Sequence, residues 1–235
     1  MRPVTASLTL CLDTSDGVAV ALLRDGEELA GARSDEARRH VETLTPLITG
    51  CLQQAGATAA EITEVAVGTG PAPFTGLRVG LVTARTFAQA RGIPALGVSS
   101  LEAIAAAAAA PGTEVLVATD ARRREVYWGR YRRTETGVQI VAGPGVGTAT
   151  DLAAAHTDLI DAGRVVGAGV RLYPQALATG LDQDAIEEAG ATVVDAAMLG
   201  RLARERAAAG AEQPTRALYL RNPDIAPPSR RKRAS

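Results

Sequence analysis

The sequence has few of the residues that metal sites and disulfide frameworks require. Its 235 residues include two cysteines and two histidines. Cys11 lies in a strand-like apolar pattern and Cys51 in a helix-like one, which predicts two buried free thiols in a reducing compartment. His40 is followed four positions later by Leu44, so the His-x-x-x-His spacing that places two metal ligands on one helical face is missing there. We therefore expect neither a metal site nor a disulfide.

Long apolar runs and a strong net charge are also missing. No segment approaches the roughly 20 apolar residues of a membrane span, and the N-terminus lacks the pattern of a secretory signal. The net charge is −1 and the isoelectric point about 6.2, which gives no general attraction to nucleic acid or to an anionic membrane. These features predict a cytoplasmic protein without membrane contact, whose contact with RNA is local or made by a partner.

The order of the apolar segments predicts an α/β fold in two lobes, each with a core and a mixed sheet of its own. Three strands over residues 8–32 form an antiparallel meander, after which helices and strands alternate. A second strand-rich segment begins at Glu114. We expect four parts: an N-terminal lobe (1–111), a smaller second lobe (112–194), a C-terminal helix and strap that packs back across both lobes (195–222), and a disordered basic tail (223–235).

Short polar patterns predict where several helices begin. Thr58 and Ser99 each precede a glutamate by three positions, as in a capping box. Asp195 is the expected N-cap of a helix that ends at Gly210, directly after a predicted strand over residues 192–194.

The stretch Gly68–Gly80 predicts a turn between a buried strand and a helix, because its glycines and prolines suit neither element. Thr75 is the expected N-cap of a helix that starts at Gly76. This helix has two apolar faces separated by a polar stripe, so it is either fully internal or it offers its second face to another protein. The first face has Leu77, Leu81, Ala84 and Ala88, the second has Val79, Val82 and Ala90, and the stripe has Arg78, Arg85 and Gln89.

Polar residues also gather at the tip of the first hairpin, at Asp13, Thr14 and Ser15. An acid and two hydroxyls there suit a phosphate with its magnesium water, but the same residues are common in ordinary hairpin turns. Asp120 lies at the corresponding place in the second unit.

Six sequence blocks occur in an order that points to a known family. They are Asp13-Thr14-Ser15, Arg39-His40-Val41-Glu42, Gly70-Pro71-Ala72-Pro73-Phe74-Thr75-Gly76-Leu77-Arg78-Val79-Gly80, Gly97-Val98-Ser99-Ser100-Leu101-Glu102, Asp120-Ala121-Arg122 with Glu125-Val126-Tyr127, and Tyr219-Leu220-Arg221. Together they resemble the TsaB (YeaZ) family up to about Pro223. The most specific block is the turn that contains Pro71, Phe74, Thr75 and Gly76. In that family a glycine usually stands at the position of Ala72, which leaves the backbone conformation at Ala72 in question.

The resemblance implies a two-lobed actin/hexokinase/Hsp70-like fold (ASKHA, ribonuclease H-like). It also implies a role in the bacterial synthesis of N6-threonylcarbamoyladenosine (t6A) on tRNA. In the family TsaB is a non-catalytic scaffold that pairs with its paralogue TsaD, and the pair recruits the ATPase TsaE. We therefore assign no catalytic residue to this chain and expect tRNA to be reached through the complex. The older glycoprotease label is not supported, since Ser99 and Ala103 occupy the positions of the histidine pair.

A stand-alone ATP-dependent small-molecule kinase is the alternative from another class. Such a site needs an acid for magnesium and two glycine-rich phosphate loops. Neither Asp13 nor Asp120 precedes such a loop, and Pro144 removes a donor from the glycine-rich stretch 143–147. The residues leave room for weak binding of ATP or ADP but predict no turnover by this chain alone, and no cofactor is required.

Apolar helix faces give the hypothesis for the partner surface. The helix over residues 41–52 and the helix after the turn are expected to meet two helices of a TsaD-like paralogue, or of a second copy when that paralogue is absent. The expected interface residues are Val41, Leu44, Ile48, Leu52, Val79 and Val82, with Arg78 and Arg85 beside them. For the basic residues 230–233, disorder in solvent and contact with RNA phosphates stay open as alternatives.

Overall fold

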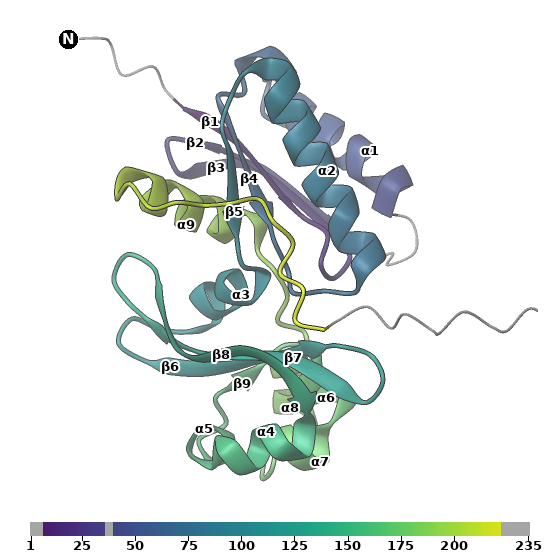
Figure 1. Ribbon diagram of the computed structural model, residues 1–235, viewed down its shortest axis with the longest axis vertical. Helices are drawn as coiled ribbons and strands as arrows, with labels where there is room; N and C mark the ends of the chain where they lie inside the picture. Colours follow the sequence, from purple (N-terminus) through teal and green to yellow (C-terminus); the bar gives the residue numbers. More distant parts are fainter. Residues whose placement is uncertain (1–6, 36–39, 222–235) are drawn as a thin grey trace, which may run out of the picture.

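The computed structural model describes residues 7–35 and 40–221, which form two mixed β-sheets with helices (Figure 1). The first sheet contains β1 (Leu8–Asp13), β2 (Val18–Arg24), β3 (Glu27–Ser34), β4 (Glu64–Gly68) and β5 (Ala95–Val98). In the order β3-β2-β1-β4-β5, the first three strands form the predicted antiparallel meander, and β4 and β5 continue the sheet as parallel strands.

The second sheet contains β6 (Glu114–Asp120), β7 (Glu125–Arg133), β8 (Val138–Thr148) and β9 (Val165–Val166) in the order β8-β7-β6-β9. β6, β7 and β8 are antiparallel, and β9 pairs in parallel with β6. The prediction of an α/β fold with two mixed sheets is confirmed.

Helices cover both faces of the first sheet (Figure 1). They are α1 (His40–Gln54), α2 (Phe74–Arg91), α3 (Ser100–Ala108) and α9 (Ala196–Ala208), with the short 3-10 helix η1 (Ala59–Glu61) before β4. Because successive strand residues point to opposite faces, Leu10 and Leu12 of β1 pack in one cluster with α1 and α2. Cys11 packs in another cluster with α3 and α9.

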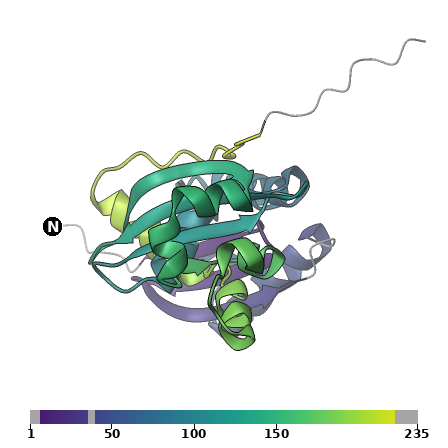
Figure 2. The same ribbon diagram turned by 90° about the horizontal axis from the view of Figure 1, so that it is seen from below.

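Short helices cover the outer face of the second sheet, as the view from below in Figure 2 shows. They are α4 (Ala149–Ala155), α5 (Thr157–Asp161), α6 (Gly169–Leu172), α7 (Pro174–Leu177) and α8 (Gln183–Gly190). The sequence analysis missed α5, α6 and α8.

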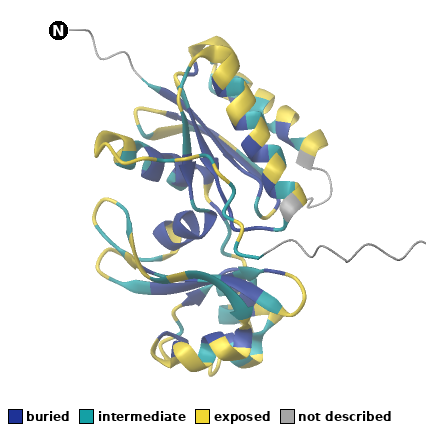
Figure 3. Ribbon diagram, in the orientation of Figure 1, coloured by how far each residue is buried: buried dark blue, intermediate teal, exposed yellow. Residues whose placement is uncertain are grey.

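Each lobe has a core cluster of its own, as the sequence predicted, and a third cluster lies between the two sheets. This third cluster joins Ala66 of the first sheet, Val117 and Tyr131 of the second, and residues of α3 and α9. α3 is buried along most of its length between the sheets (Figure 3). The packed α3 therefore connects the lobes through apolar contacts.

Several predicted helix starts are corrected. α2 begins at Phe74 with Pro73 at its N-cap, so Thr75 lies inside the first turn and caps nothing. The capping box at Ser99 is also wrong, because Glu102 pairs instead with Arg206 of α9 at 2.9 Å. The strand predicted over residues 192–194, directly before α9, is not formed.

Other local predictions are confirmed. The capping box between Thr58 and Glu61 is present, and the Asp195 carboxylate accepts hydrogen bonds from the backbone of Ala197 and Met198. The glycine-rich stretch 143–147, which the sequence analysis assigned to no element, lies within β8.

After α9 the chain becomes a strap, residues 211–221, that runs from the first sheet to the second (Figure 1). The Gly97 amide donates to the Gln213 carbonyl at 3.0 Å, and the Leu218 amide donates to the Thr69 carbonyl at 2.8 Å. At its end the Arg221 guanidinium donates to the Ala121 carbonyl at 3.2 Å. The expected tail, 223–235, lies outside the described residues. Among the residues described, no helix is both long and apolar enough to cross a lipid bilayer.

Candidate functional site

The end of β1 carries the first group of predicted site residues, and Asp13 is buried there with 2% of its surface exposed. Its carboxylate accepts hydrogen bonds from the Ser15 hydroxyl (2.6 Å), the Ser15 amide (2.8 Å) and the Ser100 hydroxyl (2.6 Å). Burial raises the pKa of Asp13 above its ordinary value, although these hydrogen bonds act in the opposite direction. The backbone of Gly68 lies so close that a Cβ there would overlap the carboxylate. Asp13 thus links β1 to α3 rather than facing solvent.

Thr14 is buried too, and its hydroxyl bonds to α2. It donates to the Gly76 carbonyl at 2.9 Å and accepts from the Gly80 amide at 3.0 Å. Side chains at the hairpin tip are therefore used to hold the neighbouring elements together.

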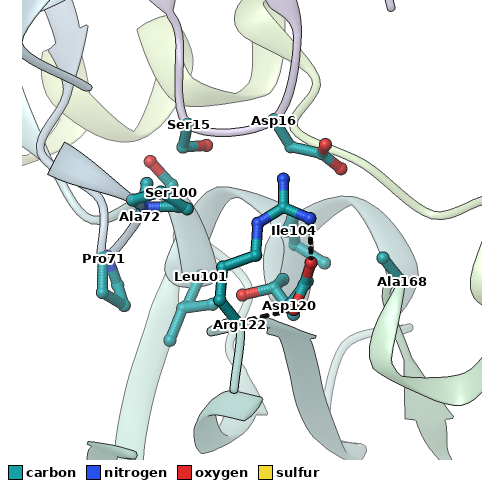
Figure 4. A pocket seen from close by; sticks show the side chains of 12 residues that line it. Ser15, Asp16, Pro71, Ala72, Ser100, Leu101, Ile104, Asp120, Arg122 and Ala168 are labelled. Carbon is teal, nitrogen blue, oxygen red and sulfur yellow. Dashed lines mark hydrogen bonds and ion pairs between the residues drawn. The ribbon is translucent and has the colours of Figure 1, made fainter. Parts of the chain in front are cut away.

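A small cavity of about 60 Å³ lies between the two sheets (Figure 4). Ser15 and Asp16 of the hairpin and Asp120 and Arg122 of the second sheet line it, whereas Asp13 and Thr14 do not. Figure 4 shows the Arg122 side chain extending across the cavity toward the hairpin, and its guanidinium pairs with Asp120 at 2.9 Å. The fold therefore brings Ser15 and Asp120 to one site, as the sequence suggested, with an arginine between the sheets that the sequence analysis did not assign to it.

The cavity volume bears on the kinase alternative. Small-molecule sites usually enclose about 300–1,000 Å³, and a space of about 60 Å³ holds a few water molecules. Within the described ranges, no group of three or more histidine, cysteine, aspartate or glutamate side chains is placed to bind a metal ion.

The characteristic turn lies at the edge of this cavity. Pro71, Ala72 and Pro73 line it, while Thr75 is exposed and Gly76 is half-buried. The side chain of Phe74 is outside the described part. Positive φ occurs at Gly70 (83°) but not at Ala72, so the alanine has a backbone conformation that any residue can adopt.

The predicted partner surface is formed by α1 and α2, which contact each other on one face of the first sheet. Val41 is 72% exposed and Val82 61% exposed, and Arg85 is exposed. The half-buried residues of the predicted interface pack against the core beneath the two helices. They are Ile48, Leu52 and Val79. Leu44 is 2% exposed and belongs to that core. Its predicted place on the surface is wrong, because this position of α1 points at the sheet.

The strap reaches the same surface. The Arg78 Nε donates to the Tyr219 hydroxyl at 3.1 Å, and the guanidinium carbon lies 5.9 Å from the centre of the tyrosine ring, a cation–π geometry. Sequence reasoning missed this contact, since the two residues are 141 positions apart. The only signal was that both lie within the blocks of the resemblance.

Residues 34–220 match the family model of TsaD, tRNA N6-adenosine threonylcarbamoyltransferase. An uncharacterized protein of Mycobacterium leprae is 45% identical over 151 residues, which are 62% of this chain and 40% of that protein. The Escherichia coli tRNA threonylcarbamoyladenosine biosynthesis protein TsaB is 36% identical over 132 residues, which are 55% of this chain and 57% of TsaB. The chain thus spans about half the length of these two relatives.

Among solved structures, YeaZ from Pseudomonas aeruginosa superimposes with a TM-score of 0.76 at 28% sequence identity. The superposition covers 91% of this chain and 100% of that structure. The similarity therefore includes both sheets.

Proposed function

The chain belongs to the TsaB (YeaZ) family, and from this we propose that it is a non-catalytic partner in the synthesis of t6A on tRNA. It would act in the cytoplasm by pairing with a TsaD-like paralogue that performs the transfer. The pair would recruit a TsaE-like ATPase, and the tRNA would be reached through the complex.

The observation that supports this proposal is the pair of exposed apolar side chains Val41 and Val82 on two adjacent helices. Apolar side chains on neighbouring helices lose unfavourable contact with water when two helices of another protein pack over them. The half-buried apolar residues of α1 and α2 between them would extend the contact. A second copy of the chain would use the same surface when the paralogue is absent, because two-fold dimers pair identical patches.

The surroundings of Asp13 and the cavity between the two sheets support a role without catalysis. The buried Asp13 already accepts three hydrogen bonds from protein groups, so it has little capacity left for a magnesium ion or its water. Arg122 extends across the cavity in Figure 4, which reduces the space for a nucleotide. We propose that ATP or ADP binds weakly here if at all and is not a required cofactor.

The proposal is tested by size-exclusion chromatography with light scattering on the full chain. We expect a homodimer of the chain alone and a heterodimer after mixing with the TsaD-like protein of the same genome. Formation of t6A on a tRNA transcript, with the TsaE-like ATPase and activated threonylcarbamoyl donor supplied, should require the chain. A chain that neither binds the TsaD-like protein nor changes the yield of t6A would refute the proposal.

A further inference from the structure

The turn between β6 and β7 holds three consecutive arginines in an uncommon conformation. Arg122, Arg123 and Arg124 have φ values of 62°, 55° and 64°. This left-handed region is sparsely populated by residues with a Cβ and favours glycine. Such conformations persist where the surrounding structure imposes them, and they concentrate at functional sites.

Hydrogen bonds fix the shape of this turn. The Arg122 amide donates to the Asp120 carboxylate at 2.7 Å, and the Glu125 amide donates to the Arg122 carbonyl at 3.0 Å. The Ala121 amide donates to the Glu125 carbonyl at 3.0 Å. The three arginines are therefore displayed on a closed turn, and all three are exposed.

The turn concentrates positive charge in a chain whose net charge is −1. Asp120 is paired with Arg122, and Glu125 with Arg221 of the strap. The acids that flank the turn are thus engaged by two arginines, and Arg123 and Arg124 add positive charge beside them.

We propose that this turn binds backbone phosphates of RNA, and in the context of the proposed function, on which the choice of ligand rests, those of tRNA. Guanidinium groups bind phosphate oxygens through paired hydrogen bonds, and backbone phosphates need no apolar pocket. A protein partner is the less suitable occupant, because interfaces enriched in arginine also contain aromatic and other apolar residues at their centre. The exposed residues of this turn are arginines.

The test measures binding of a fluorescent tRNA transcript to the full chain by anisotropy at 50 to 200 mM salt. The variant is Arg123→Gly/Arg124→Gly, because glycine suits the left-handed backbone and should keep or raise the melting temperature. The matched control is Arg24→Ala/Arg164→Ala. It removes the same charge from exposed positions at the opposite strand ends.

Two lost phosphate contacts lower the slope of log affinity against log salt by about 1.4–1.8. The wild type and the control should therefore lose about tenfold more affinity between 50 and 200 mM salt than the glycine variant. Equal salt dependence of all three proteins would overturn the proposal. Loss of the TsaD-like heterodimer in the glycine variant without a change in RNA binding would also overturn it and would assign the turn to an acidic protein partner.

The RNA titrations and the chromatography together separate this inference from the proposed function. If the wild type forms no heterodimer, the proposed function fails. The salt dependence of RNA binding by the wild type, the glycine variant and the control, each without a partner, still decides whether the turn binds RNA. If the heterodimer forms and the glycine variant binds RNA like the wild type, only the inference about the turn fails.

Discussion

The hydroxyl of Thr14 lies between two backbone groups of α2, the Gly80 amide at 3.0 Å and the Gly76 carbonyl at 2.9 Å. These groups are four residues apart, the separation that an α-helix joins by a direct hydrogen bond. The tip of the first hairpin is thereby attached to the helix of the proposed partner surface. Gly80 is required for this approach, since a Cβ there would overlap the Thr14 side chain.

We expect Gly80→Ala to destabilise the protein, although alanine in an exposed helix is favoured over glycine by about 1 kcal/mol. The overlap with Thr14 outweighs that gain. In the background of Thr14→Ala the same change should cost less, because the overlapping atoms are gone. A double-mutant cycle from urea unfolding measures the coupling, and additive effects would contradict the contact. Thr14→Val, which keeps the volume but loses both hydrogen bonds, should itself cost about 1–3 kcal/mol.

The buried Asp13 predicts a dependence of stability on pH. In the folded protein, burial raises the pKa of this carboxyl above its ordinary value of 3.8. Its contribution to stability is therefore fully present below the unfolded pKa and is lost as pH rises through the folded pKa. Asp13→Asn cannot ionise. Its free energy of unfolding relative to the wild type should therefore rise with pH above about pH 4.

Ser100→Ala gives a second measurement on the same carboxyl. It removes a hydrogen bond that stabilises the charged form of Asp13, so the loss of stability at rising pH should be larger than in the wild type. Urea unfolding of the three proteins between pH 4 and pH 8 measures both effects. Parallel curves for the wild type and Asp13→Asn would show that the carboxyl is not perturbed.

The partner surface is tested by Val82→Glu. A charge at this exposed position should abolish both the homodimer and the heterodimer while leaving the monomer folded, because the charge would have to be desolvated in either interface. Leu172→Glu is the matched control, since Leu172 is 50% exposed but lies on α6, beside the second sheet. Chromatography with light scattering distinguishes the variants. Unchanged elution of Val82→Glu with the TsaD-like protein would contradict the assignment of this surface.

Leu44 and Val41, three positions apart on α1, should respond differently to truncation. Leu44→Ala removes buried apolar volume and should lower the free energy of unfolding by about 2–5 kcal/mol. Val41→Ala should change it by less than about 0.5 kcal/mol but weaken dimer formation. Equal losses of stability would mean that the two residues do not differ in burial.

The kinase alternative predicts consumption of ATP by the purified chain without partners. We expect none above the background, because Asp13 is engaged by Ser15 and Ser100 and the cavity between the sheets is small. A coupled assay for ADP over a panel of small alcohols and sugars checks this. Turnover that depends on the chain and is lost in Asp13→Asn would favour a kinase.

The sequence by itself determined the order and type of most elements, because hydrophobic periodicity and turn residues act over a few neighbouring positions. The meander of β1 to β3, the long helices and the cap at Asp195 follow from such local patterns. Family membership also followed from the sequence, since it depends on the order of motifs along the chain.

Only the tertiary structure decided which side chains are exposed, which contact a neighbouring element and which lie in the core. Helical spacing places Leu44 and Val41 on the same general side of α1, but only packing against the sheet shows that one is buried and the other exposed. The bonds of Thr14 to α2 and the contact of Arg78 with Tyr219 join residues 62 or more positions apart. Contacts at that separation depend on how the whole chain packs, which local patterns cannot specify.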